Sequence, residues 1–487
     1  MARYLADVNA RYIPVGTKIV VGVAAVIVSL FSKDPGLFLF GMAVAIFIVT
    51  LFYNKMEPPI LLSAAIFAWF FFQGQLFDAL SKNTDIASLD YHSNTKPTII
   101  FLGICAVLIF YIGVRLTSRN LRTITFEEFK SFLMRINLER LFMLYVTIYF
   151  LLFAAETFFW MISGLTQPLV VLGQFKWSLF YLIFVTCFVQ DRMKFWLFVI
   201  IVVDVSLSFF SYFSHFKEAI YFSFFAYWVF YFRTFLFSKV LTIACLVLTF
   251  YLGAYWTAVK KDYRTFLNRG TGTQAIRVTR EEAYSKLSDL VRNLKPEDVD
   301  NGFDDLVTRF SWIGAFDAVY NHVPNKVPFQ NGNLWMEGIS RPFLPRLLFP
   351  NKTGLTDSKE LNYYSGLNVD EKHTSISLSM VAGSYVDFGS WGMFVPLFFF
   401  GAFCGWVYRK AVLWGRYPVV GYALAMPLTY LFQINEQSIN RIVSAMILFV
   451  LALWFISRFA INPFLRFILI SEKQPRPKLP VNAPSLG

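Results

Sequence analysis

The run PTIIFLGICAVLIFYIGV (residues 97–114) contains no charged residue and is followed directly by Arg115. Such a stretch is typical of a helix that crosses a bilayer, because lipid offers no hydrogen-bond partner to an unpaired backbone amide. Similar runs recur along the chain, at about 19–31, 36–53, 59–77, 141–161, 173–190, 195–210, 218–232, 239–257, 390–408, 417–433 and 442–460. The sequence therefore predicts an all-α polytopic membrane protein with about twelve transmembrane helices.

The composition supports this fold class. Of the 487 residues, 56% are hydrophobic and 15% are charged, against roughly 45–50% and about 25% in ordinary globular chains. The mean hydropathy is +0.53, and the chain contains 57 Phe residues. These values exclude a soluble enzyme and a disordered tail protein. The net charge of +13 is expected of a membrane protein with basic cytoplasmic loops, so we predict no nucleic-acid partner.

The basic residues predict the orientation. If the N-terminus is cytoplasmic, the basic stretch between the fourth and fifth runs is also cytoplasmic, as are the basic residues at 192–194, 233–239 and 409–416. The intervening connections carry few Lys or Arg. By the positive-inside rule we expect the protein to span its membrane with both ends in the cytoplasm. The turn signal at residues 32–36 predicts that the first two helices form a hairpin.

This topology places the longest polar stretch, from about Lys260 to Gly389, outside the membrane. Thr279 and Glu282 form a capping-box pattern before an amphipathic helix, which Lys295-Pro296 ends. A second surface helix is predicted with an apolar side from Phe303 to Phe316. The Pro- and Gly-rich stretch 324–368 is predicted to be an irregular loop. The expected organisation is helices 1–9 in residues 1–258, the external loop in 259–389, helices 10–12 in 390–462 and a tail in 463–487.

Charged residues at the external rim are costly, so they are candidates for a functional site. His215 and Lys217 lie at the outer mouth of the eighth run, where Lys217 is either an anion ligand or a lysine reaching for the interface. A second cationic segment holds Arg341, Arg346 and Lys352. Arginine forks match phosphate oxygens, so this segment suits a phosphate-rich ligand, although it is also compatible with a solvated basic loop.

A further set of polar residues flanks the return into the membrane. Glu371 and His373 are candidate general bases, and Asp387 is either an acid or a helix cap. Arg309 is either a substrate ligand or the partner of Asp305, four residues earlier. The remaining substrate-binding candidates are Tyr385, Glu436 and Arg441. The sequence contains no HExxH, CxxC or P-loop pattern, so we predict neither a metal nor a cofactor. The four cysteines fall in apolar runs and are expected to be buried hydrophobic residues.

Two stretches of the external loop resemble a known family. RPFLPRLLFPNK (residues 341–352) is similar to the PR-x-x-x-P-x-K element of the Wzy-type oligosaccharide repeat-unit polymerases, with Pro345, Arg346, Pro350 and Lys352 at its positions. VAGSYVDFGSWG (residues 381–392) looks like that family's re-entry into the next helix. It departs from the family pattern in two places, with Ser384 in place of Glu and Asp387 in place of Asn.

The resemblance implies a concrete activity. Such enzymes transfer a growing glycan from one undecaprenyl pyrophosphate carrier to the terminal sugar of another lipid-linked repeat unit, on the periplasmic face and without a metal. Cations would stabilise the departing pyrophosphate, and we expect Arg346, Arg341, Lys352, Lys217 and Arg309 to supply them. The base would be His373, Glu371 or Asp387. The expected partners are lipid-linked oligosaccharides, membrane lipids and a co-polymerase that regulates chain length.

Three other functions are compatible with parts of this pattern. An O-antigen ligase shares the lipid-linked donor and the large periplasmic loop, and only its product distinguishes it from a polymerase. A transporter or flippase would have broken helices with charges near the membrane midplane, and the sequence predicts neither. A polyprenyl-phosphate-sugar glycosyltransferase would carry acidic residues in the first external loop, where this chain has Asp34 alone.

Overall fold

The computed structural model describes residues 10–159, 166–208, 216–270, 277–310, 313–344, 349, 357–369 and 376–470. In these residues the protein consists of helices and connections, and the only β-pairing is an isolated bridge between Ile136 and Leu469. The first half of the chain forms α2 (Val15–Ser29), α3 (Pro35–Phe52), α4 (Ile60–Ser81), α5 (Lys96–Ser118), α6 (Phe126–Leu133), α7 (Leu138–Phe159), α8 (Thr166–Gly173), α9 (Lys176–Gln190), α10 (Lys194–Ser208), α11 (Phe216–Tyr231) and α12 (Leu236–Leu267).

The second half begins with short helices and ends with long apolar ones. Its elements are α13 (Arg280–Arg292), α14 (Pro296–Phe310), α15 (Gly314–His322), α16 (Asn333–Ser340), η1 (Arg341–Phe343), α17 (Asp357–Ser365), α18 (Met380–Gly392), α19 (Phe394–Trp414), α20 (Pro418–Ala425), η2 (Met426–Tyr430), α21 (Ile439–Phe455), η3 (Ile456–Ala460) and α22 (Ile461–Ile468).

Six of the described helical stretches are long and apolar enough to cross a membrane, so the protein is a helical membrane protein. They are Pro35–Phe52, Ile60–Ser81, Lys96–Ser118, Pro168–Gln190, Ser238–Leu267 and Ile439–Ile468. The shorter α2 is also apolar, and it is joined to α3 through a turn that ends at Pro35, as the hairpin prediction requires.

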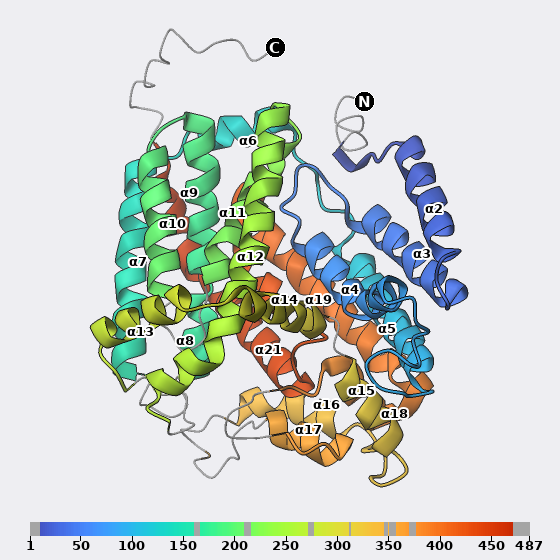
Figure 1. Ribbon diagram of the computed structural model, residues 1–487. Helices are drawn as coiled ribbons and strands as arrows, with labels where there is room; N and C mark the ends of the chain where they lie inside the picture. The colour runs from blue at the N-terminus through green and yellow to red at the C-terminus, as the bar shows by residue number, and fades with distance from the viewer. Residues whose placement is uncertain are drawn as a thin grey trace.

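The bundle has two distinct ends (Figure 1). At the termini end, Lys55 N–H donates to Ala10 O at 3.0 Å, and Ile470 N–H donates to Arg135 O at 2.8 Å. Both ends of the described chain therefore lie beside the α6 region. Helices α15 to α18 lie at the opposite end, which we call the loop end. The basic connection around α6 and the long polar stretch thus lie on opposite sides of the bundle.

Among the described helices, α5 and α19 share the most extensive contact, although they come from opposite halves of the chain. A β-carbon added at Gly401 would lie 2.1 Å from Phe110 O, and one added at Gly405 would lie 2.1 Å from Val114 O. The Thr117 hydroxyl donates to Ala402 O at 2.6 Å. Small residues four apart let membrane helices approach until their backbones touch. Glycine is therefore required at these two positions for α19 to pack against α5.

Several predicted spans are interrupted. The run 417–433 is not one helix, because α20 gives way to the 3₁₀ turn η2 after Ala425. The run 173–190 begins at a short break between α8 and α9, two helices that together make up the candidate span Pro168–Gln190. The last span continues through a π-turn, η3, and α22 to Ile468, beyond the predicted boundary at 462. Sequence periodicity marks apolar length but not local changes of helix type, which depend on neighbouring helices.

The surface helices are only partly as predicted. The capping box is present, because Glu282 N–H donates to the Thr279 hydroxyl and the Glu282 carboxylate accepts from Thr279 N–H. The second predicted surface helix corresponds to two helices in the structure, since α14 ends at Phe310 and α15 begins at Gly314. α14 lies across α12, where a β-carbon added at Gly302 would lie 2.6 Å from Ala254 O.

The stretch 324–368 is more regular than predicted. It contains α16, η1 and α17, so its description as an irregular loop was wrong for these residues. α16 is short and its first turn is capped from another helix, which a local pattern cannot reveal. Of the four cysteines, Cys187 and Cys404 are buried as expected, whereas Cys245 is exposed on α12.

The glycine contact predicts the outcome of a substitution. Gly401→Leu would force α19 away from α5, because the new side chain meets the backbone at Phe110 rather than a side chain that can rotate. We expect a cost of at least about 3 kcal/mol, seen as loss of monodisperse protein in size-exclusion chromatography after detergent extraction. Gly22→Leu is the matched control, because a β-carbon at Gly22 meets nothing within 4 Å. Equal yields for the two variants would contradict the inferred contact.

Candidate functional site

The loop end is tied to the membrane helices by a buried carboxylate. Asp317 of α15 accepts hydrogen bonds from the hydroxyls of Tyr91, at 2.9 Å, and Ser93, at 3.0 Å, both in the connection between α4 and α5. The Thr95 hydroxyl donates to the same carboxylate. Asp317 is 3% exposed, so each of these bonds forms away from bulk water. α15 is therefore held rigidly against the start of α5.

A second set of contacts orients α16 and α18. Asp387 of α18 accepts from Leu334 N–H at 3.2 Å and Trp335 N–H at 3.1 Å, in the first turn of α16. These amides would otherwise lack partners inside α16. Asp387 is thus the cap of a distant helix. The sequence left two roles open for Asp387, an acid or a helix cap, and its contacts support the cap. Burial raises the pKa of Asp387, while the hydrogen bonds from α16 oppose that rise.

The polypeptide turns sharply just after Asp387. Gly389 has φ 69° and ψ −173°, a conformation that side chains with a β-carbon disfavour. This kink separates the loop-end part of α18 from α19. The neighbouring Tyr385 packs on the ring of Tyr320 with centroids 5.0 Å apart and donates to Val323 O at 2.8 Å. Tyr385 therefore has a packing role between α15 and α18.

Charged side chains converge where α16, α17 and α21 meet. Asp357, at the start of α17, contacts Arg441 of α21 through two bonds, with Nη2 to Oδ2 at 2.7 Å and Nε to Oδ1 at 3.2 Å. The Asp357 side chain is 3% exposed and that of Arg441 is 46% exposed. Burial raises the pKa of Asp357, against the effects of Arg441 and Ser438. Arg441 uses the Nε–Nη2 edge of its guanidinium on Asp357, and its side chain remains partly exposed.

A second ion pair and an additional carboxyl complete the group. Arg341 Nη1 lies 2.7 Å from Glu337 Oε1, and Arg341 is 7% exposed. Burial is the largest cause that raises the pKa of Glu360 to about 7, and the carboxylates of Asp357 and Glu337 add to it, while Arg341 lowers it. We call Glu337, Arg341, Asp357, Glu360 and Arg441 the acid–arginine cluster. It combines a carboxyl that exchanges protons near neutral pH with two guanidinium groups.

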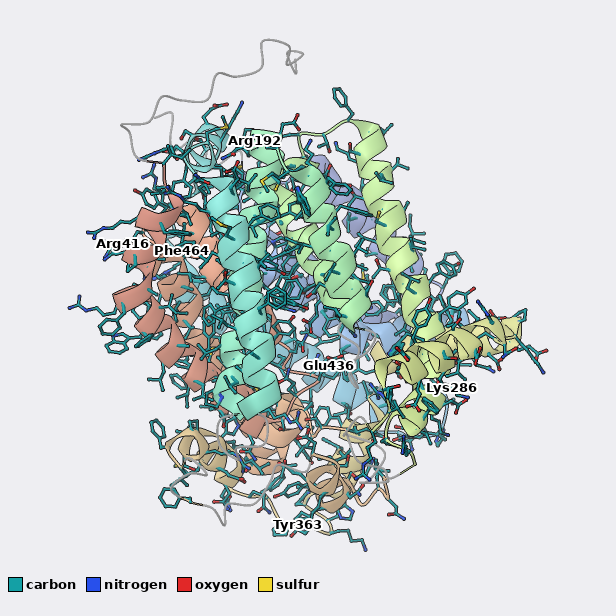
Figure 2. All side chains as sticks on the ribbon, turned by 90° about the vertical axis from the view of Figure 1, so that its left-hand side faces the viewer. Arg192, Lys286, Tyr363, Arg416, Glu436 and Phe464 are labelled. Carbon is teal, nitrogen blue, oxygen red and sulfur yellow. The ribbon has the colours of Figure 1, made fainter. Side chains whose placement is uncertain are left out.

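The other predicted residues are distributed as follows. Lys217 is exposed at the first turn of α11, and its neighbour Glu218 acts electrostatically on Tyr430 of η2. Glu436 is exposed in the connection before α21 and lies between the bundle and the loop-end helices (Figure 2). Arg309 belongs to α14, and its side chain lies outside the described residues. So do His215, Arg346, Lys352, Glu371 and His373, whose roles stay predictions.

Sequence reasoning missed three members of the cluster, namely Glu337, Asp357 and Glu360. The spacing of Asp357 and Glu360 puts both carboxylates on one face of a helix, but this pattern also fits a solvated surface. The pairing of Asp357 with Arg441 joins residues 84 positions apart. Only the packing of α17 near α21 makes that pair, so no local signal could have found it.

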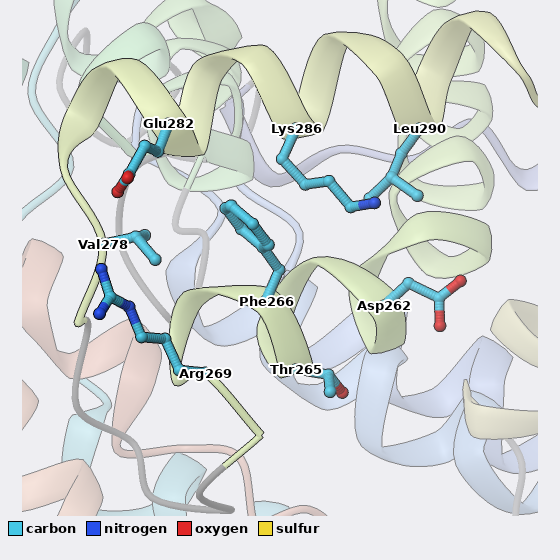
Figure 3. Close-up of a pocket in the computed structure, with 8 residues that line it drawn as sticks. All are labelled: Asp262, Thr265, Phe266, Arg269, Val278, Glu282, Lys286 and Leu290. Atoms are coloured by element: carbon cyan, nitrogen blue, oxygen red, sulfur yellow. The ribbon is translucent and has the colours of Figure 1, made fainter.

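A cavity lies elsewhere on the molecule. It has a volume of about 480 Å³ and opens between the end of α12 and α13, with Phe266 facing Lys286 (Figure 3). Arg269, Asp262 and Glu282 line its rim, but Glu282 already serves in the capping box. No member of the acid–arginine cluster lines it. The acid–arginine cluster combines two guanidinium groups with a carboxyl of raised pKa, so we regard it as the stronger candidate site.

The fold and this cluster define a class, a helical membrane protein with a charged site at one end of its bundle. A family model described as a domain of unknown function (DUF8712) matches residues 39–463, so the chain belongs to that family. The match includes both the membrane helices and the whole acid–arginine cluster. A search of curated proteins and a search of solved structures returned no match.

The environment of Glu360 predicts a pH-dependent stability. Its pKa of about 7 lies above the ordinary value of 4.5, so the folded protein binds this proton more tightly than the unfolded chain does. The contribution of Glu360 to stability is full below pH 4.5 and is lost as the pH rises through 7. We expect Glu360→Gln to melt at a higher temperature than the wild type at pH 8, by an amount equivalent to about 2 kcal/mol, with the difference closing towards pH 4.5.

The measurement is a thermal melt of the detergent-solubilised protein at several pH values. Glu297→Gln is the control, because Glu297 is an exposed residue of the first turn of α14. A difference between Glu360→Gln and the wild type that is the same at every pH would contradict the raised pKa.

The Asp357–Arg441 pair predicts a pattern in a double-mutant cycle. Arg441→Ala leaves the buried Asp357 carboxylate unpaired, and breaking such a pair costs about 3–5 kcal/mol. Asp357→Asn in the same chain removes the uncompensated charge, so the double variant should be more stable than Arg441→Ala alone. Additive effects in the thermal melts of the single and double variants would show that the two side chains do not interact.

Proposed function

We propose that the protein polymerises undecaprenyl-pyrophosphate-linked oligosaccharide repeat units on the periplasmic face of the bacterial inner membrane, as a metal-independent glycosyltransferase. The observation that carries this proposal is the acid–arginine cluster, in which Glu360 has a pKa of about 7 within the electrostatic reach of Arg341, and Asp357 on the same helix pairs with Arg441. Transfer from a pyrophosphate carrier needs a base for the attacking hydroxyl and cations for the leaving group. The cluster offers both kinds of group at one place.

In the proposed reaction the acceptor hydroxyl oxygen forms a bond to C1 of the donor sugar while the C1–O bond to the pyrophosphate breaks. The hydroxyl proton moves to the Glu360 carboxylate, and the bonding electron pair leaves with the pyrophosphate. Arg441 stabilises that charge with the edge of its guanidinium turned away from Asp357. Arg346 and Lys352 remain the sequence-based candidates for additional cations, and His373 and Glu371 the alternative bases.

The proposal includes twelve spans with both ends in the cytoplasm. Contacts between connections support this topology, because successive helices run between the same two ends of the bundle. Asp34 accepts from Ile86 N–H at 2.9 Å, near the loop end. At the termini end, Gln190 donates to Ile136 O at 2.8 Å, and Trp228 donates to Asn54 O at 2.8 Å. Lipid-linked oligosaccharides, membrane lipids and a chain-length-regulating co-polymerase are the proposed partners.

Two alternatives are distinguished by experiment. An O-antigen ligase-like transferase would use the same chemistry but transfer a finished glycan once. A transporter is favoured by the break between α8 and α9, beside which Lys176 Nζ lies 3.2 Å from Asp204 Oδ1 of α10. Charges beside a broken helix are typical of transporter binding sites. Translocation of lipid-linked repeat units without a change in their length would support that function.

The test uses purified protein in proteoliposomes supplied with lipid-linked repeat units. We expect a ladder of products that differ by one repeat unit, with an activity that rises with pH around a midpoint near 7, where Glu360 ionises. Glu360→Gln should lower the rate by about 100-fold or more and remove this pH limb. Arg346→Ala should slow extension, because one cation for the leaving group is lost.

Glu297→Gln is again the matched control and should extend chains at the wild-type rate. A single transfer to an acceptor would identify a ligase. Failure of the wild-type protein to extend any chain, under conditions in which a known polymerase succeeds, would refute the proposal. If Glu360→Gln had wild-type activity, the proposed reaction would stand, but Glu360 would not be its base.

A further inference from the structure

The helix that carries Glu337 and Arg341 exposes an apolar face. Met336, Ile339 and Phe343 follow one another at spacings of three and four residues along α16 and η1, and are 65%, 45% and 67% exposed. At these spacings the three side chains lie on one side of the segment. An apolar face of this kind marks a surface that contacts lipid or another protein.

The depth of α16 relative to the membrane helices decides whether lipid or another protein covers this face. Gly338 packs against Ile439 and Asn440 at the start of α21, and the Ser444 hydroxyl donates to Gly338 O at 3.2 Å. Ser444 lies about 8 Å along α21 from its first residue, at 1.5 Å per residue. α21 begins the last candidate span, Ile439–Ile468. α16 therefore lies beside the first turns of a membrane-crossing helix rather than beyond its end (Figure 1).

The apolar face continues into a second exposed stripe. Trp391, Val395 and Phe399 recur every four residues on α18 and α19, and are all exposed. α19 packs along the candidate span α5, so its outward side faces the bilayer. Phe388 links the stripe to α16, because a β-carbon at Gly332 would lie 3.1 Å from its ring. The exposed face of α16 thus adjoins a surface that lipid covers.

The charges of α16 are arranged for such a position. Arg341 is buried and paired with Glu337 at 2.7 Å, so the segment presents no isolated guanidinium to lipid. By contrast, Tyr363 of α17 lies at the far loop end of the molecule (Figure 2) and is 61% exposed. The exposed residues of α16 and α17 therefore meet different media, lipid for α16 and water for α17.

We propose that the α16–η1 segment is embedded in the lipid leaflet at the loop end of the bundle, with Met336, Ile339 and Phe343 among the acyl chains. This inference does not depend on the proposed reaction. It brings the acid–arginine cluster to the level of the lipid headgroups. If the proposed function is correct, the cluster then receives the pyrophosphate of a lipid-linked substrate directly from the bilayer.

The test compares the accessibility of single cysteines in purified protein in lipid nanodiscs. Met336→Cys and Phe343→Cys are the test variants, and Tyr363→Cys, at a similarly exposed position (61%), is the aqueous control. The reagent is a charged, membrane-impermeant maleimide, and labelling of the unmodified chain, whose Cys245 is exposed on the candidate span α12, gives the background. We expect the two test positions to react at least about tenfold more slowly than residue 363, since charged reagents are excluded from hydrocarbon.

Labelling in SDS shows that each cysteine is chemically competent, and size-exclusion profiles show that each variant is folded. Spin labels at the same positions give a second readout, because lipid-embedded labels collide more often with oxygen than with a water-soluble nickel chelate. Equal labelling rates at 336, 343 and 363 would overturn the proposal. Protection in native membranes but not in nanodiscs would also overturn it, in favour of a protein partner.

Discussion

The backbone contact between α5 and α19 is the constraint on which the rest of the structure depends. Gly401 and Gly405 bring the two helices together until a β-carbon would strike the carbonyls of Phe110 and Val114. The contact joins segments almost 300 residues apart, and everything between them, including the loop-end helices, must fit into the space that it leaves. Inside lipid there is little hydrophobic drive for helices to associate, so close van der Waals packing and the Thr117 hydrogen bond supply the attraction.

The position of the candidate site depends on this contact through the packing of neighbouring helices. The kink at Gly389 joins α19 to α18, and Asp387 then caps α16, so the position of Arg341 depends on the glycine contact through one continuous chain of packing. Two ion pairs hold charges that would otherwise be too costly so close to lipid. Burial, together with the nearby carboxylates of Asp357 and Glu337, raises the pKa of Glu360. The same burial that makes Glu360 suitable for proton transfer also makes it a burden on stability above neutral pH.

Much of the fold was predictable because it depends on local composition. Apolar length predicted the membrane helices, and the Thr279–Glu282 pattern predicted the start of α13, since a capping box involves residues three apart. The breaks after Gly173 and Ala425 were not predictable, because apolar content does not change across them. Of the candidate site, Arg341 and Arg441 were among the residues selected from the sequence, but their partners Glu337 and Asp357 were not. Those partners become visible only when α16, α17 and α21 are brought together.

By itself, the sequence determined that this is a helical membrane protein, with basic residues gathered on one side and a long polar stretch on the other. These properties follow from the cost of placing charges and unpaired amides in lipid, which each segment meets on its own. Tertiary structure alone decided which carboxylates pair with which arginines, that Asp387 caps a distant helix, and that the pKa of Glu360 rises to about 7. The reason is physical: burial and charge pairing depend on neighbours that lie far away along the chain, and only the folded bundle supplies them.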